Sequence, residues 1–397
     1  MSAFKFHGLC PATHTPFHGD GRLNLDVVER QAAHLLARQI DRVFIGGTTG
    51  ESASLTVAER LALGDRWAAV ARATGIKVVV HVGAQCLADA AELAAQAQRN
   101  QASAVSMIAP SYFKPRTLDD LVASCAQVAA AAPGLPFYYY DIPAMTGIAG
   151  FPVDDFLRAA APRIPNLAGV KYSNPDLGAY LLGKRLDGGK YDLPWGIDEY
   201  FLAALTMGAQ GGVGSTYNFV PGPLQRMMAA FPQGDLATCQ LEQDRMMQVI
   251  RIVARRGYMG CAKALMTHLG VAVGPARLQI GDARRHRAAY RLGEPVGGLG
   301  FGEVGADRVH HGAHADAAWG LARPDSGGVP GRRQLHEYHH AAAPLLPADC
   351  CVLPPLCAAC AAGRASPPAR PSSARGTAWP SARGRGPDRA RARGPRC

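Results

Sequence analysis

The chain has 397 residues, which is enough for one large α/β barrel with appendages or for two to three ordinary domains. Its 48% hydrophobic content is sufficient for a large core, and no window approaches the ~18 consecutive apolar residues that a membrane-spanning helix needs. The net charge of +11 comes mainly from residues 281–397, with 17 Lys and Arg against 9 Asp and Glu, so it carries no information about partners of the first 280 residues.

Short β-rich runs alternate with amphipathic helical stretches from residue 7 to about residue 231. We expect strands at residues 8–13, 42–47, 77–83, 104–109, 136–141, 167–172, 193–197 and 211–216. We expect helices at residues 24–39, 56–74, 87–98, 117–132, 153–161, 176–182, 199–207 and 222–231. Eight such alternations predict an α/β fold, a (β/α)8 TIM barrel over residues 1–231. Residues 232–280 are expected to add C-terminal helices, at about 235–256 and 260–270, that pack on the barrel.

The composition changes after residue 280. Residues 281–397 contain no Lys, Ile, Asn or Met and hold 17 Gly and 13 Pro, a composition typical of disorder. The four missing residue types share codons that begin with A followed by A or T, so their joint absence indicates a GC-rich strand read out of register. We therefore interpret this Arg/Gly/Pro/Ala-rich tail as disordered and derived from a frameshift.

The cysteines indicate neither disulfides nor a metal site. Five of the ten precede residue 281 without any disulfide or metal-ligand spacing, namely Cys10, Cys86, Cys125, Cys239 and Cys261. Tail residues with some resemblance to zinc ligands fit no zinc template, namely Cys351, Cys357, Cys360, His339, His340, His310 and His314. Because the N-terminus also has no hydrophobic run of signal-peptide length, we expect a cytoplasmic protein with reduced thiols.

Chemistry-bearing side chains follow the predicted strand ends, which meet at one face of such a barrel. They are Thr48, Thr49, Tyr140, Lys171, Asp198 and Ser215. Lys171 ends an apolar strand, where burial should lower the pKa of its amine and suit it to attack a ketone as a Schiff-base lysine. The alternative for Lys171 is an ordinary surface lysine at a strand end. The Gly46–Glu51 segment can offer backbone N–H groups and two hydroxyls to an anion, or it can be a plain strand-to-helix turn.

Three segments, taken together and in this order, resemble the dihydrodipicolinate synthase/N-acetylneuraminate lyase family of class I aldolases. They are Gly46-Gly-Thr-Thr-Gly-Glu51, Tyr140-Asp-Ile-Pro143 and Gly169-Val-Lys-Tyr-Ser173, within a similarity that runs from residue 4 to about residue 280. The resemblance implies that Lys171 is the Schiff-base nucleophile, that Tyr140 relays protons, and that Thr48 and Thr49 grip the carboxylate of pyruvate. Ser173, two residues beyond Lys171 on the same face, is expected to line the same pocket.

Two further stretches resemble the sialic-acid lyase branch, Trp195-Gly-Ile-Asp-Glu199 and Gly214-Ser-Thr-Tyr-Asn218. Without the resemblance, they could be a helix N-terminus with favourable acids and a plain eighth strand. The resemblance implies that the polyhydroxy tail of a sugar acid is bound by Gly196, Asp198, Glu199 and Ser215. Met145 stands where the synthases place an Arg that clamps a second carboxylate.

The resemblance therefore implies cleavage of N-acetylneuraminate to pyruvate and N-acetylmannosamine, in sialic acid catabolism, by a homotetramer. The mechanism needs no cofactor and no metal, and we expect neither a membrane nor a nucleic-acid partner. One alternative is a pyruvate-dependent aldolase or dehydratase acting on another 2-keto-3-deoxy sugar acid, because the Schiff-base core is shared. The other alternative is an inactive homologue whose basic tail binds nucleic acid.

Overall fold

The computed structural model describes residues 4–277. The chain divides into two units, Met1–Arg323 and Pro324–Cys397, and all the described residues belong to the first. The tail predicted over residues 281–397 lies outside the described residues, and so do its histidines and cysteines discussed above.

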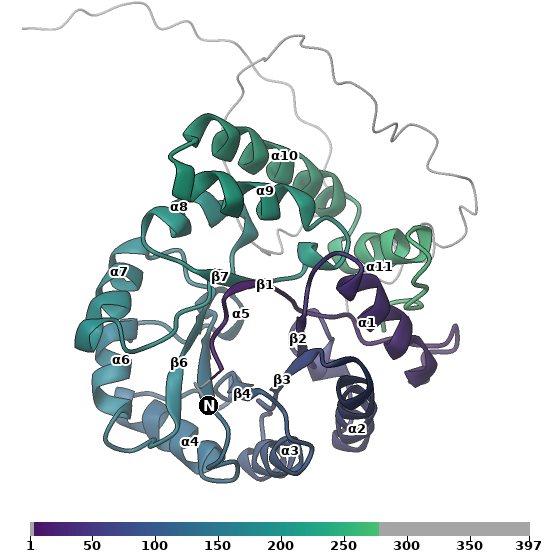
Figure 1. Cartoon of the computed structure of the whole chain (residues 1–397). Coiled ribbons are helices and arrows are strands. Elements are labelled where there is room, and N and C mark those ends of the chain that lie inside the picture. The colour runs from purple at the N-terminus through teal and green to yellow at the C-terminus, as the bar shows by residue number, and fades with distance from the viewer. Residues whose placement is uncertain (1–3, 278–397) are drawn as a thin grey trace, which may run out of the picture. The chain divides into compact units, whose positions relative to one another are not determined.

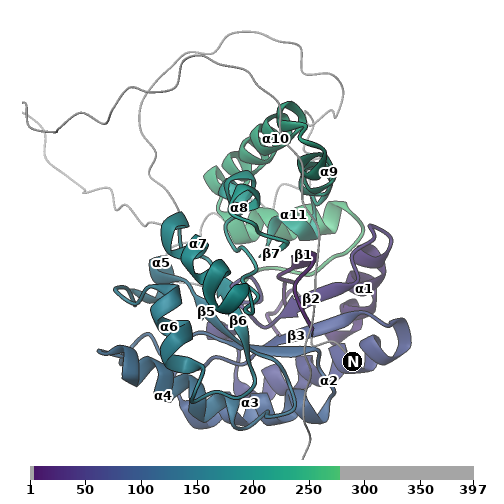
Figure 2. The same cartoon turned by 60° about the vertical axis from the view of Figure 1, so that its left-hand side comes forward.

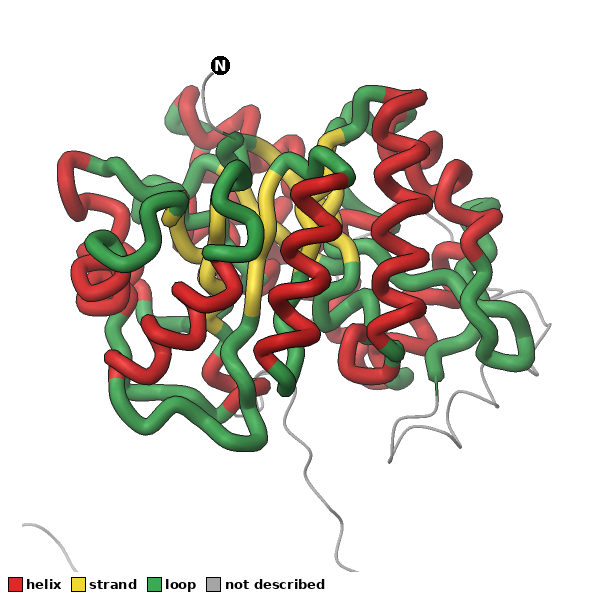
Figure 3. Tube along the Cα trace, turned by 90° about the horizontal axis from the view of Figure 1, so that it is seen from below, coloured by secondary structure: helices red, strands yellow, loops and turns green. Residues whose placement is uncertain are grey.

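Parallel strands form a ring with helices around it, which is a TIM barrel (Figures 1 and 3). The strands are β1 (Gly8–Pro11), β2 (Arg42–Ile45), β3 (Lys77–His81), β4 (Ala104–Met107), β5 (Phe137–Asp141), β6 (Leu167–Tyr172) and β7 (Gly211–Gly214). Strands β2 to β6 pair in chain order, and β1 pairs with β7. Bridges from Ala12 to Phe44 and from Trp195 to both Tyr172 and Gly212 join these two sheets into the ring. The predicted fold class is confirmed.

The strand predicted at residues 193–197 is wrong as a continuous strand. In its place the chain makes isolated bridges at Asp192 and Trp195. Pro194 lies between these two residues and has no N–H group to donate, so the ladder to β6 is interrupted there. The segment still fills the gap in the ring, because the Pro194 carbonyl accepts a hydrogen bond from Tyr172 N at 2.9 Å.

Helices on the outside of the ring begin and end close to the predicted residues. They are α1 (Val28–Leu36), α2 (Val57–Thr74), α3 (Leu87–Arg99), α4 (Leu118–Ala129), α6 (Val153–Ala160), α7 (Leu177–Arg185), α8 (Phe201–Thr206) and α9 (Gly222–Ala230). Helix α2 starts with a capping box formed by Thr56 and Glu59. A short helix, α5 (Pro143–Thr146), was not predicted, and Pro143 at its first position is well suited to start it.

Two more helices follow the barrel repeats. Helix α10 (Leu236–Arg255) packs along α9, and α11 (Tyr258–His268) contacts α10 (Figure 2). Met266 of α11 joins Val27, Val271 and Val273 in a small apolar cluster near the start of α1. Within residues 4–277, none of the helices combines the length and apolar character required to cross a bilayer.

Alternation along the strands decides which side chains enter the ring. Successive side chains of a strand point to opposite faces, and Tyr140 of β5 is the register partner of Lys171 of β6. Tyr140 belongs to the cluster inside the ring with Phe44 and Tyr138, whereas Tyr139 packs in the cluster shared with the surrounding helices. The pairing therefore brings Tyr140 and Lys171 together inside the barrel, near the C-terminal ends of their strands.

Candidate active site

Lys171 lies in an enclosed aromatic environment. Its side chain is 4% exposed, and its Nζ atom lies 3.4 Å from the centroid of the Tyr140 ring and 4.7 Å from that of Phe44. Burial lowers the pKa of the Lys171 amine below 10.5, although the neighbouring Tyr140 acts in the opposite direction. A lower pKa increases the neutral fraction of the amine near neutral pH, and only the neutral amine can attack a carbonyl carbon.

The contact with Lys171 also changes the pKa of the Tyr140 phenol. Burial raises its pKa, but the charge of Lys171 and polar contacts with Lys171, Thr48 and Ser173 outweigh burial, so the pKa falls below 10. A phenol that is buried, close to an amine and easier to deprotonate than usual can pass protons at a reacting centre. The contacts also bring the ends of β2, β5 and β6 to one point.

The glycine-rich loop Gly46–Glu51 follows β2 and carries Thr48 and Thr49. Its first residue has a left-handed backbone with φ of 63°, and a Cβ atom on Gly47 would lie 2.6 Å from the Phe44 ring. Thr48 is exposed and Thr49 is half-buried, and the Thr48 side chain is hydrogen-bonded to Tyr140. The loop geometry therefore requires glycine at both positions and leaves two hydroxyls at its tip.

His81 at the end of β3 fixes the start of this loop. Its Nδ1 donates a hydrogen bond to the Gly46 carbonyl at 2.9 Å, and its ring lies 6.0 Å from that of Tyr140. Burial, reinforced by the charges of Arg60 and Lys171, lowers the pKa of His81 well below 6.5, so the ring is neutral. His81 lies within the strand predicted at residues 77–83, and nothing local to it indicates a contact with Gly46.

Ser173 and Gly196 form the next part of the rim, beyond Lys171. The Ser173 hydroxyl donates to the Gly196 carbonyl at 3.3 Å. A Cβ atom at position 196 would lie 1.9 Å from the Ser173 oxygen, so any other residue there would displace the Ser173 hydroxyl. This close approach brings the end of β6 against the segment that replaces the seventh strand.

Asp198 and Glu199 are two carboxyl groups that follow this segment. Asp198 is 6% exposed, and its Oδ2 accepts hydrogen bonds from the Thr216 hydroxyl at 2.5 Å and from Thr216 N at 3.4 Å. Burial raises the pKa of Asp198, and the bonds from Thr216 oppose this rise. Burial and the nearby Asp198 also raise the pKa of Glu199. Asp198 is close enough to Lys171 for its charge to affect the pKa of the amine.

Ser215 contacts Tyr258, a residue that was not predicted to belong to the site. Its hydroxyl is hydrogen-bonded to the hydroxyl of Tyr258, the first residue of α11. Burial, with the charges of Asp198 and Glu199, raises the pKa of Tyr258, so this phenol stays protonated. Tyr258 lies between two predicted helices and outside every strand-end pattern, so no pattern in the sequence indicated its contact with Ser215.

The predicted residues thus form two adjoining groups. Four of them gather around the amine, namely Thr48, Tyr140, Lys171 and Ser173. Four others extend along the rim, namely Gly196, Asp198, Glu199 and Ser215. Thr49 stands beside Thr48 on the loop. Met145, on the short helix α5, is 47% exposed. An amine, a proton relay and a set of fixed polar partners suit imine chemistry on a polyhydroxylated keto acid.

Comparisons with known proteins agree with this chemistry. The sequence profile described as the dihydrodipicolinate synthetase family matches residues 5–288. N-acetylneuraminate lyase of Gallus gallus is 38% identical over 281 residues, which cover 70% of this chain and 91% of that relative. The solved structure of Proteus mirabilis N-acetylneuraminate lyase has a TM-score of 0.68 and 37% identity, over 72% of this chain and 97% of that one. For the sialic acid aldolase of Aliivibrio salmonicida the TM-score is 0.68 and the identity 34%, over 72% and 96% of the two chains.

Proposed function

The chain belongs to the dihydrodipicolinate synthetase family, and from this membership we propose that it is a class I carbon–carbon lyase that cleaves N-acetylneuraminate to pyruvate and N-acetylmannosamine. The observation that carries the proposal is the position of the Lys171 amine, 3.4 Å from the centroid of the Tyr140 ring in an enclosed environment. Support for the substrate comes from relatives named N-acetylneuraminate lyase, such as the one in Gallus gallus with 38% identity.

Lys171 and Tyr140 carry the chemical steps. The neutral amine of Lys171 adds to the C2 ketone, and loss of water gives an imine whose protonated form draws electrons from the C3–C4 bond. Tyr140 donates its phenol proton to the hydroxyl that leaves as water, and the resulting phenolate accepts the proton of the C4 hydroxyl as the C3–C4 bond breaks, so that the sugar aldehyde leaves. The remaining enamine is protonated at C3, and water releases pyruvate and the free amine. The low pKa of the Tyr140 phenol, caused by the adjacent Lys171, supports this role.

Thr48 and Thr49 bind the substrate carboxylate together with backbone N–H groups of the Gly46–Glu51 loop. The contact of Thr48 with Tyr140, and the position of Thr49 beside it on a loop of glycines, support this role. Fixed donors aimed at an anion cost little reorganisation during the reaction, so the loop also stabilises charge that develops near C2. Anchoring the carboxylate holds the ketone within reach of Lys171.

Four residues bind the hydroxyl-rich tail, namely Gly196, Asp198, Glu199 and Ser215, and Ser173 lines the pocket beside Lys171. Support comes from the rigid setting of Asp198, which Thr216 holds by two hydrogen bonds. A site built from such partners rejects a substrate without the matching hydroxyls, because its buried polar groups would be left unpaired. Met145 cannot bind a second carboxylate, which disfavours condensation of pyruvate with aspartate semialdehyde.

We also propose a homotetramer in the cytoplasm. Tyr112 and Phe113, in the loop between β4 and α4, are 79% and 86% exposed and contact each other edge to face, which supports burial against another copy. The cysteines within residues 4–277 are free thiols, as expected in a reducing compartment. Light scattering coupled to size-exclusion chromatography measures the assembly directly, and a monomer at micromolar concentration would refute it.

The test of the proposed function is reduction of the imine. Incubation of the full chain with pyruvate and borohydride should attach the keto acid to Lys171 alone, as located by peptide mass. Lys171→Arg keeps a positive charge but forms no imine, so it should fold and be neither trapped nor active. Release of pyruvate from N-acetylneuraminate by the unmodified protein completes the test. An adduct on Lys184 or Lys190 in place of Lys171 would refute the assignment.

A further inference from the structure

The glycine-rich loop ends in a carboxylate that is completely enclosed. Glu51 Oε1 lies 2.6 Å from Lys263 Nζ, and both side chains are 0% exposed. Lys263 comes from α11, outside the barrel repeats, and its Nζ also donates to the Thr15 carbonyl at 2.9 Å and to the Pro275 carbonyl at 3.0 Å. It lies 4.3 Å from the centroid of the Phe17 ring. The ion pair therefore ties the loop of Thr48 and Thr49 to a helix far along the chain.

Stability alone is a weak reason to keep such a pair. Removing two charges from water costs several kcal/mol per ion. Well-packed apolar side chains of similar volume often stabilise a fold as much as a buried ion pair or more. A buried pair does fix one geometry, because each ion must keep its partner. The Glu51–Lys263 pair is thus better suited to defining the position of the loop than to strengthening the fold.

The backbone at Glu51 needs such a restraint. Its φ of 56° and ψ of 36° lie in the left-handed region, which a residue other than glycine rarely adopts. Glu51 N donates to the Thr48 carbonyl at 3.0 Å, so the conformation of Glu51 sets that of Thr48. The Gly50 carbonyl accepts a hydrogen bond from the Thr15 hydroxyl at 2.6 Å. Side-chain and backbone contacts therefore restrain the same turn.

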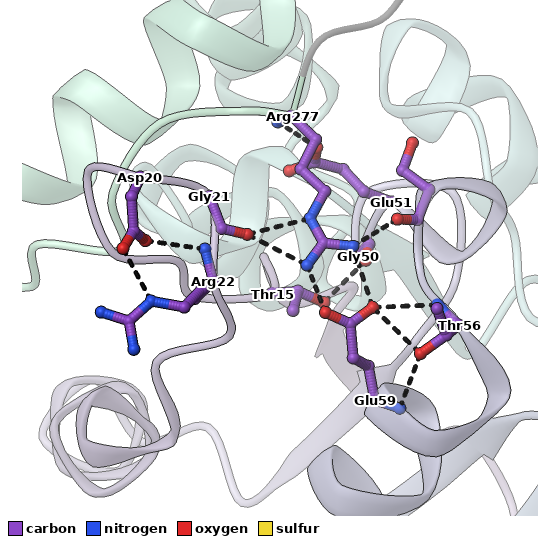
Figure 4. A network of polar contacts seen from close by, with 10 residues as sticks. Thr15, Asp20, Gly21, Arg22, Gly50, Glu51, Thr56, Glu59 and Arg277 are labelled. Carbon is purple, nitrogen blue, oxygen red and sulfur yellow. Dashed lines mark hydrogen bonds and ion pairs between the residues drawn. The ribbon is translucent and has the colours of Figure 1, made fainter.

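The last described residues complete this restraint. Arg277 N donates to Glu51 Oε2 at 2.8 Å, so the carboxylate is held from α11 and from the segment after it. The guanidinium of Arg277 binds the Gly21 carbonyl and the carboxylate of Glu59, as Figure 4 shows. The same helix that supplies Lys263 begins with Tyr258, which contacts Ser215. Helix α11 thus contacts Ser215 directly and holds the loop of Thr48 and Thr49 through Glu51.

We propose that Glu51 and Lys263 are a positioning pair that holds Thr48 and Thr49 in the conformation that binds the carboxylate of the keto acid. Neither side chain touches the substrate. The proposal rests on the proposed function, because it concerns the loop that binds pyruvate in that mechanism. It predicts that loss of the pair weakens binding of a carboxylate-bearing ketone and leaves the reactivity of the Lys171 amine unchanged.

The decisive experiment removes both charges together in the full chain, as E51Q/K263M. Borohydride trapping is measured against the concentration of pyruvate and, separately, of hydroxyacetone, a ketone without a carboxylate. The pyruvate concentration for half-maximal trapping should rise at least tenfold, whereas the maximal trapping rate stays the same. The trapping rate with hydroxyacetone should match that of the unaltered chain.

A matched control separates positioning from general destabilisation. Glu242→Gln alters a carboxylate whose side chain is 3% exposed and which pairs with Arg226 and Arg245, on α9 and α10 and away from the loop. It should lower the melting temperature without changing trapping by either ketone. If E51Q/K263M lowers trapping by both ketones in parallel, or leaves half-saturation by pyruvate unchanged, the positioning role is wrong.

A milder variant covers the case in which E51Q/K263M fails to fold. Arg277→Leu removes a partly exposed guanidinium, so the fold should tolerate it, but the backbone N–H that serves Glu51 loses its anchorage. A rise of about threefold in half-saturation by pyruvate, with hydroxyacetone unaffected, supports the proposal, and an unchanged value refutes it. Absence of any pyruvate adduct on the unaltered chain would refute the proposed function and this inference with it.

Discussion

Asp141 is a buried carboxyl group that should destabilise the protein at neutral pH. It is the last residue of β5, directly after Tyr140, and its side chain is 7% exposed. Its Oδ2 accepts one hydrogen bond, from Asn174 Nδ2 at 3.0 Å. Burial raises the pKa of Asp141 from 3.8 to about 6, although the bond from Asn174 opposes this shift. Asp141→Asn keeps the shape and an acceptor for Asn174 but removes the charge.

The expected gain in the free energy of unfolding follows from the pKa shift of Asp141. A carboxyl group with a raised pKa in the folded state favours folding while it is protonated, and this contribution is lost as the pH rises through about 6. A shift of about two units at ~1.4 kcal/mol each makes Asp141→Asn more stable by about 3 kcal/mol at pH 8. The advantage should fall to about 1 kcal/mol at pH 4.5, where Asp141 is mostly protonated in the folded state.

Denaturation by urea at the two pH values measures this difference, with both proteins at the same concentration. Asp192→Asn is the matched control, because Asp192 Oδ2 accepts from Phe6 N at 2.7 Å and from the Tyr138 hydroxyl at 3.0 Å. Loss of these charge-assisted bonds should destabilise by about 1 kcal/mol or more. An Asp141→Asn protein that is no more stable at pH 8, or whose advantage does not change with pH, would refute the reasoning.

Three further predictions concern the active site and the tail. Tyr140→Phe should slow cleavage about 10²- to 10⁴-fold. It should also move the pH midpoint of borohydride trapping downward, because Tyr140 opposes the lowering of the Lys171 pKa; an upward move would contradict the assigned contact. Asp198→Ala should lower kcat/KM for N-acetylneuraminate by a factor that corresponds to about 1–3 kcal/mol of lost transition-state stabilisation. Trapping by pyruvate should not change, and unchanged turnover of N-acetylneuraminate would contradict the role of Asp198. Limited proteolysis should trim the chain to near residue 280 without loss of lyase activity, and a protease-resistant tail would show that the interpretation of residues 281–397 as disordered is wrong.

The sequence was sufficient to predict the barrel and the meeting of Tyr140 and Lys171 inside it. Tyr140 and Lys171 each end an apolar run, and adjacent parallel strands with a side-chain period of two bring such residues together. Pro194 marks the place where the prediction of the fold was wrong. Strand propensity predicted a continuous strand at residues 193–197, but Pro194 has no N–H group, so the strand is interrupted there.

The contacts that support the site could not be predicted. Lys263 binds the Thr15 carbonyl across 248 positions of sequence, and Tyr258 reaches Ser215 from a helix beyond the barrel repeats. Patterns of a few residues describe one strand or one helix, so they carry no information about which distant elements meet. His81 was missed for the same reason, although its partner Gly46 belongs to a recognised motif.

Because α11 comes late in the chain, its contacts with the site can form only at the end of synthesis. Lys171 and Tyr140 emerge from the ribosome long before Tyr258, Lys263 and Arg277, whose contacts fix Ser215 and Glu51. A nascent chain that ends before α11 therefore has Lys171 and Tyr140 but not the contacts that restrain Glu51 and Ser215. Such a fragment should bind keto acids poorly, so incomplete copies would not compete with the finished enzyme for substrate.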